Sequence, residues 1–171
     1  MSKPNSFVIQ KRSRKKSRAG DIFVFQLDYI PEYFFGMVIS DCPTYFPGSA
    51  PEEEFRLIYI YKHTSPDKNQ IPILHSEDLL VEPIIIARQA WSYGYFENVA
   101  HHDIVQSDYC KASYWIHAGK DFYTVDWSNN LWTKTKYPGV GWTSVTGVAS
   151  AAGIESRICQ ELNIISPVEL S

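Results

Sequence analysis

Two apolar segments joined by a short polar turn constrain the fold more than any other part of this chain. Residues 21–27 (DIFVFQL) and 33–39 (YFFGMVI) carry apolar or aromatic side chains at both odd and even positions. Because successive side chains of a strand point to opposite faces, such segments are typical of buried strands. Pro31 favours a turn between them. We therefore expect an antiparallel hairpin in which Gly36 permits a bulge or a close backbone approach.

Further short strands are predicted along the chain. They are expected at residues 55–61, 71–75, 113–117 and 121–127, with tight turns at 118–120 and 129–130. Residues 79–86 are interpreted as an edge strand or as two strand pieces, because Pro83 cannot donate to a ladder. Helix capping by Thr143 or Ser144 accounts for the glycine-rich stretch 139–147.

The end of the chain has a helical pattern. Ala151, Ile154, Ile158 and Leu162 recur at helical spacing, and Pro167 follows as a stop. Aromatic residues make up 15% of the chain and suit half-buried strands. The expected fold class is α+β, mainly β: a strongly bent antiparallel sheet or small open barrel with a C-terminal amphipathic helix. Residues 19–171 are expected to form a single domain.

Charge is distributed unevenly along the sequence. Residues 1–20 hold seven of the sixteen Lys and Arg and no acidic side chain, so residues 21–171 carry a formal charge of −10. Residues 1–18 are interpreted as a flexible basic arm, which serves either as a solvated tail or as a grip on nucleic acid or an acidic patch. An acidic body attracts cationic proteins and repels phosphate backbones.

The candidate partner-binding residues combine carboxylates with aromatic rings. They are Glu52, Glu53, Glu54, Asp126, Trp127 and Trp132. The three glutamates end a proline-rich loop over residues 42–54 and form either a solvated charge run or a phosphate mimic for a basic active site. The two tryptophans flank the polar turn at 128–130, where an exposed ring could anchor a partner. Trp91 and Trp115 are expected to be buried.

No catalytic or metal-binding motif is predicted. His101 and His102 are adjacent, and on a strand their side chains would point to opposite faces, which disfavours a shared metal ion. Cys110 lacks the local signatures of a nucleophile and is interpreted as an inert cysteine. We therefore expect a non-enzyme without metal or cofactor. The three separated cysteines and the lack of a signal-peptide pattern favour the cytoplasm, and no membrane association is expected.

The first hairpin also carries a family resemblance. The sequence RAGDIFVFQL at residues 18–27, followed by YFFGMVI at 33–39, resembles the start of the immunity protein 26 family of bacterial polymorphic toxin systems. In that family a basic lead, a Gly-Asp/Glu-x-Phe strand and an aromatic-x-Gly-x-Val strand open a β-rich domain. The resemblance implies a cytoplasmic protein that binds and blocks a cognate toxin, often a nuclease.

Three functions remain open at this stage. The first is an immunity protein that covers a basic toxin cleft with its acidic surface. The second is a small-barrel module that binds nucleic acid through the basic arm, with aromatic side chains stacking bases. The third, a hydrolase, requires His101, His102 or Cys110 to meet in one pocket.

Overall fold

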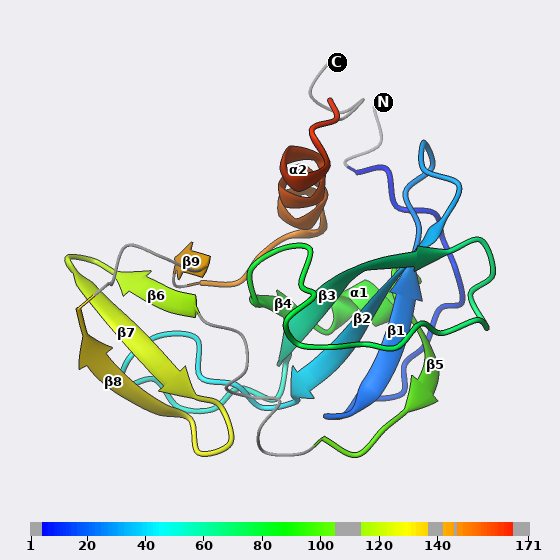
Figure 1. Cartoon of the computed structure of the whole chain (residues 1–171). Coiled ribbons are helices and arrows are strands. Elements are labelled where there is room, and N and C mark those ends of the chain that lie inside the picture. Colours follow the sequence, from blue (N-terminus) through cyan, green and yellow to red (C-terminus); the bar gives the residue numbers. More distant parts are fainter. Residues whose placement is uncertain (1–4, 105–113, 137–141, 146, 166–171) are drawn as a thin grey trace.

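The strands of this chain form two sheets (Figure 1). The structure is a computed structural model that describes residues 5–104, 114–136, 142–145 and 147–165. The larger sheet, in the order β4-β3-β2-β1-β5, comprises β1 (Asp21–Phe25), β2 (Tyr33–Ser40), β3 (Phe55–Ser65), β4 (Ile84–Ala87) and β5 (Glu97–His101). The smaller, in the order β8-β7-β6-β9, comprises β6 (Tyr114–Ala118), β7 (Asp121–Asp126), β8 (Leu131–Thr135) and β9 (Trp142–Val145). Two helices, α1 (Gln89–Ser92) and α2 (Ala151–Leu162), complete the described elements, so the mainly β class is confirmed.

The predicted first hairpin lies at the heart of the larger sheet. Strands β1 and β2 pair antiparallel, and all five residues of β1 are buried. Gly36 faces Phe23 across the pair, and a Cβ on Gly36 would lie 2.2 Å from the Phe23 ring. The register between β2 and β3 also shifts next to this glycine. The predicted close approach at Gly36 is confirmed, whereas the extra residues of the neighbouring register shift lie on β3.

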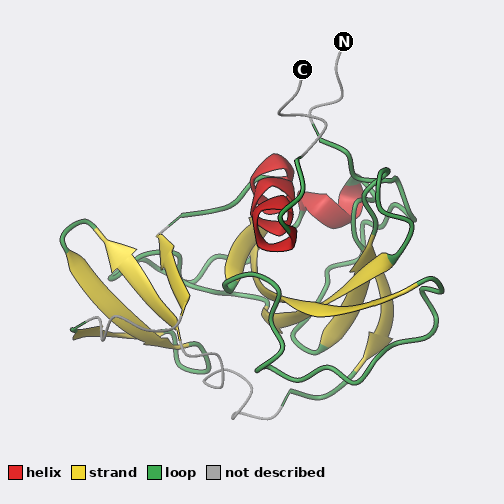
Figure 2. Cartoon of the chain, turned by 45° about the horizontal axis from the view of Figure 1, so that its top comes forward, coloured by secondary structure: helices red, strands yellow, loops and turns green. Residues whose placement is uncertain are grey.

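Alternation along β1 divides the core into two layers. Phe23 and Phe25 belong to the layer that α2 covers with Ile154 and Ile158 (Figure 2). The side chains of the opposite face of β1 belong to the other layer, to which Trp127 of the smaller sheet also contributes. The two sheets therefore share a core instead of forming one bent sheet.

The predicted turns of the smaller sheet are confirmed. Strands β6 and β7 pair antiparallel around Gly119, which has a positive φ of 64°. Strands β7 and β8 pair antiparallel around a turn that contains Asn130 at φ 51°. Asparagine tolerates this left-handed conformation better than most residues, which explains its place in the turn.

Of the local predictions between β3 and β5, one differs from the structure. Residues 71–75 form no strand, so that prediction is wrong. The proline break is confirmed: Leu79 makes an isolated bridge to Tyr61, and β4 begins directly after Pro83 at the edge of the sheet. Trp91 is buried as expected, although it lies in α1.

The C-terminal helix forms as predicted, but its cap does not. The Ser150 side chain accepts a hydrogen bond from the Gly153 amide at 3.1 Å and caps α2. The stretch that contains Thr143 and Ser144 is strand β9, which pairs parallel to β6. Within the described residues, neither helix offers an apolar stretch of the length that a bilayer requires.

Residues 5–19, the N-terminal strap, lie against the domain, whereas residues 1–18 were predicted to be a flexible arm. Phe7 is 3% exposed and its ring lies 5.5 Å from that of Phe25. The Val8 amide donates to Gln26 O at 2.9 Å, and the Ser13 amide donates to Trp91 O at 3.0 Å. One buried ring and a set of backbone hydrogen bonds hold a segment whose composition is otherwise polar.

Candidate partner-binding surface

The acidic run, Glu52 to Glu54, lies beside the N-terminal strap. Glu53 accepts from Lys16 Nζ at 3.0 Å, and this ion pair holds the pKa of the Glu53 carboxyl below its usual range. Glu54 forms an ion pair with Arg88. Glu52 is half-buried, and its amide donates to a carbonyl of the same loop. Two of the three predicted carboxylates are thus already paired within the chain.

Arg56 joins the strap to the loop over residues 42–54, which ends in the acidic run and is called the acidic loop below. Its side chain is 2% exposed, and burial lowers the pKa of the guanidinium from its ordinary value. The guanidinium donates to the carbonyls of Ser17, Asp41, Glu53 and Phe55 and to the Ser17 hydroxyl. One buried cation therefore fixes the strap, the end of β2 and the acidic run relative to one another.

The predicted tryptophan anchors face inward. Trp127 is 2% exposed, so the expectation that it is an exposed anchor is wrong. Its ring packs 6.0 Å from that of Trp132, which is half-buried and donates from Nε1 to Thr44 Oγ1 at 2.6 Å. The neighbouring polar turn suggests exposure, but the β7–β8 hairpin folds both rings onto the loop that precedes β3. Trp115 has no described side chain, so the prediction for it is not tested.

Asp126 organises the turn after β7. Its carboxylate accepts from the Ser128 amide at 3.0 Å, the Ser128 hydroxyl at 2.6 Å and the Asn129 amide group at 2.8 Å. These hydrogen bonds hold the pKa of Asp126 below its usual range. The carboxylate is half-exposed and already has three donors, which is the arrangement of a turn-forming aspartate.

The loop over residues 42–54 brings the predicted residues together. Asn130 in the β7–β8 turn donates to the carbonyl of Cys42 at 3.2 Å and accepts from the Thr44 amide at 3.1 Å. The same loop exposes Phe46 at 42%, with its ring 4.7 Å from that of Tyr45. Phe46 is the aromatic residue that sequence analysis missed, and the signal for it is an aromatic pair directly before the Pro47–Gly48 turn.

A polar network lies at the other side of the strap. Asp21 accepts from His101 Nδ1 at 2.8 Å and from Asn98 Nδ2 at 3.0 Å, and Asn98 accepts from Trp91 Nε1 at 2.7 Å. The other ring nitrogen of His101 lies 3.4 Å from Asp103. Both nitrogens face carboxylates, so the imidazole ring is held between Asp21 and Asp103.

Of the three residues on which a hydrolase depends, the structure describes His101 and His102. The backbone amide of His102 donates to Gly20 O at 2.9 Å, and Cys110 lies outside the described residues. A search of the described residues finds no group of three or more His, Cys, Asp or Glu side chains that could hold a metal ion.

Comparison with known proteins identifies the family. The model of the family described as immunity protein 26 matches residues 18–124, more than half of the chain. The chain belongs to the immunity protein 26 family. This match contains the acidic loop and the Asp21–His101 network, whereas most of the strap and the Trp127–Trp132 pair lie outside it. Comparisons with curated proteins and with solved structures give no significant match.

Proposed function

We propose that this immunity protein neutralises a cognate toxin by direct 1:1 binding in the cytoplasm of a bacterial cell, without catalysis. The family match carries the proposal. The formal charge of −10 on residues 21–171 favours a toxin with a basic cleft, such as a nuclease. Opposite charges speed association of the two proteins and make it dependent on salt.

The acidic loop is the part of the surface that best fits such a cleft. Glu53 is exposed, and its ion pair with an exposed lysine is of the weak kind that a partner's cations can replace. Phe46 supplies an exposed ring on the same loop, and aromatic residues surrounded by polar groups often anchor interfaces. Arg56 fixes the backbone of this loop, so binding requires little ordering of the chain.

The decisive experiment measures binding to the protein encoded by the adjacent toxin gene. The loop variant E52K/E53K/E54K is compared with a matched control, E32K/E77K/E161K, which changes net charge equally at exposed carboxylates elsewhere. We expect the loop variant to weaken binding at least about 100-fold, mainly through faster dissociation, because truncated or reversed contact charges act on dissociation. We expect the control to alter only the association rate, by less than about tenfold.

A second variant tests the aromatic anchor. Phe46→Ser leaves the charge of the loop unchanged and removes an exposed ring, so it is expected to weaken binding about tenfold or more with the same salt dependence. If E52K/E53K/E54K and its charge-matched control lose toxin affinity equally, the binding site lies elsewhere on the acidic surface. Failure of the intact protein to bind or inhibit the toxin would refute the proposed function itself.

A further inference from the structure

The strap presents its basic side chains from a fixed backbone. The Gln10 amide donates to Gly94 O at 2.7 Å, and the Ser13 amide donates to Trp91 O at 3.0 Å. Further along, Arg56 binds the carbonyl and hydroxyl of Ser17. Residues between these anchors need not be ordered when a ligand binds, which lowers the entropic cost of binding.

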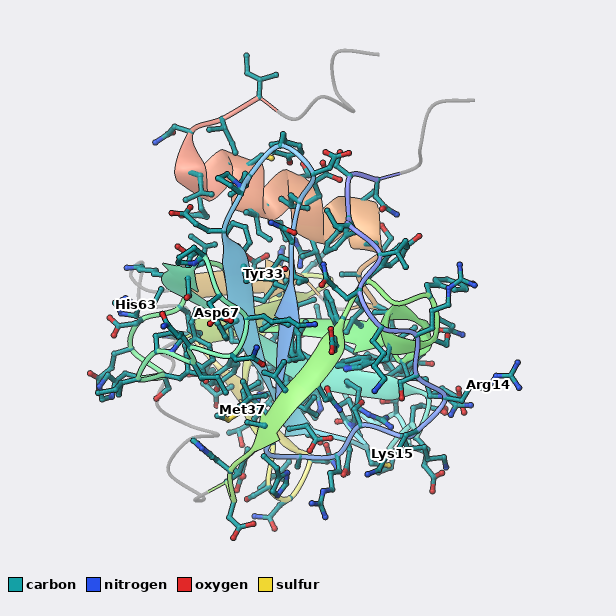
Figure 3. All side chains as sticks on the ribbon, turned by 90° about the vertical axis from the view of Figure 1, so that its right-hand side faces the viewer. Arg14, Lys15, Tyr33, Met37, His63 and Asp67 are labelled. Atoms are coloured by element: carbon teal, nitrogen blue, oxygen red, sulfur yellow. The ribbon has the colours of Figure 1, made fainter. Side chains whose placement is uncertain are left out.

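The strap also concentrates the unpaired cations of the molecule. Six exposed basic side chains lie within residues 11–18, and Figure 3 shows Arg14 and Lys15 projecting away from the body. Among the described residues, no carboxylate forms an ion pair with Lys11, Arg12, Arg14 or Lys15. Among the residues that the structure describes, the acidic body thus leaves four positive charges of residues 11–15 without an ion-pair partner.

Two of these cations, Lys11 and Lys15, border a cleft of about 490 Å³ between the strap and β5. Its basic lining comprises Lys11, Lys15, Lys16 and Arg18 on the strap, with His101 on β5. Two carboxylates also line it, but Asp21 is engaged by His101 and Asn98, and Glu97 is paired with Lys68 at 2.8 Å. Lys16 and Arg18 are themselves paired, with Glu53 and Asp21, so within the described residues Lys11 and Lys15 supply the free positive charge that the cleft offers to an anion.

An exposed aromatic ring stands beside the same segment. Tyr93 is 55% exposed, and its ring lies 5.7 Å from that of Tyr95. The next residue, Gly94, packs so closely on Arg12 that a Cβ there would lie 3.0 Å from the Arg12 side chain. An exposed ring on the residue before this contact can stack with a nucleobase, a contact that the carboxylates of an acidic peptide do not make.

We propose that the strap and its cleft form a binding site for single-stranded nucleic acid, with the strap cations on successive phosphates and Tyr93 stacking on a base. Guanidinium groups match phosphate oxygens in geometry as well as charge. The acidic body opposes this binding at long range, but salt screens that repulsion over about 10 Å at 0.1 M ionic strength. The proposal stands apart from toxin binding, which uses the neighbouring loop.

The experiment measures the affinity of the full-length protein for a fluorescent single-stranded oligonucleotide, as a function of salt. The strap variant K11S/R14S/K15S is compared with K62S/K120S/K136S, which removes three exposed cations elsewhere. We expect the strap variant to lose more than about tenfold in affinity at low salt. We also expect the slope of log K against log salt to become shallower by about 2, because each lost phosphate contact contributes about 0.7 on single strands. The control variant is expected to keep both the affinity at low salt and the slope of log K against log salt.

The variant Tyr93→Ser distinguishes binding of nucleic acid, which includes base stacking, from binding of any polyanion through charge alone. This variant is expected to lower affinity about tenfold while the salt slope stays unchanged, since stacking releases no counterions. Stronger binding of a poly-glutamate peptide than of the oligonucleotide would instead assign the strap to an acidic protein. That outcome overturns the proposal, as does absence of oligonucleotide binding near ~50 mM salt or an equal loss in both triple variants.

Discussion

Replacement of Arg56 by methionine should loosen the strap and destabilise the whole domain. The guanidinium is 2% exposed and donates five hydrogen bonds of 2.6 to 3.1 Å. Hydrogen bonds from a charged donor contribute about 1.5–3 kcal/mol each in isolation. A methionine side chain of similar length fills part of the same space but leaves all five acceptors without this donor.

The net loss is smaller than the sum of five such bonds. A cleft of about 260 Å³ borders Arg56, Ser17 and Asp41, so water can reach some of the released acceptors. Removing a buried cation also removes its desolvation penalty. We therefore expect Arg56→Met to lower the free energy of unfolding by about 3 kcal/mol, and Arg56→Lys, which keeps three donors, by about half as much.

Urea unfolding followed by tryptophan fluorescence measures these differences. Arg88→Met is the matched control, because Arg88 is more exposed and pairs with Glu54 at the surface; its expected loss is below about 1 kcal/mol. Hydrogen exchange supplies a local readout: the amide of Ala19, which donates to the carboxylate of Asp41 beside Arg56, should lose protection in Arg56→Met. A loss for Arg56→Met no larger than that of the control would refute the role assigned to this buried cation.

Three further changes test individual contacts. Gly36→Ala is expected to destabilise the protein by about 3 kcal/mol in thermal unfolding, because the new methyl group would collide with the Phe23 ring at 2.2 Å. Asp126 has a depressed pKa owing to hydrogen bonds from the turn after it, so its contribution is present above its unfolded pKa and is lost as pH falls. Asp126→Ala should therefore destabilise the protein most at neutral pH, and its effect should shrink as pH falls below the unfolded pKa of aspartate, measured by urea unfolding at each pH. Lys16→Ser frees the carboxylate of Glu53 and should speed toxin association in stopped-flow measurements at low salt; slower association would indicate that the strap itself contacts the toxin.

Local patterns in the sequence predicted the local structure well. Residues 21–27 and 33–39 are apolar at both odd and even positions, so neither strand has a polar face for solvent. This pattern is enough to predict a buried hairpin. The apolar residues of 151–162 recur at helical spacing and form one stripe, which predicts an amphipathic helix that packs on a sheet. This pattern located α2. In both cases the sequence signal is local, although the cluster that buries α2 includes residues of the distant strand β1.

Features that depend on distant partners were missed. The parallel pairing of β6 with β9 joins two strands that are separated in the sequence by β7 and β8, and no local pattern encodes it. The strap is held mainly by backbone groups, which every residue type carries, so only Phe7 could have indicated its packing. Trp127 follows the same logic: its turn looked exposed because the loop that covers it lies about eighty residues earlier in the chain.

The position of the candidate site depends on how charge is distributed, not on its sum. Beside the acidic loop, Glu53 and Glu54 are balanced by Lys16 and Arg88, so this part of the surface exerts little long-range attraction. Unbalanced carboxylates lie farther away, and Figure 3 shows Asp67 on the side opposite Arg14. Under the proposed function, a basic toxin would be guided by the distant carboxylates and held by the loop once its cations replace the internal ones. Reversal of the distant charges should consequently act on the association rate, and reversal of the loop charges on the dissociation rate, which is the contrast that separates the two triple-lysine variants.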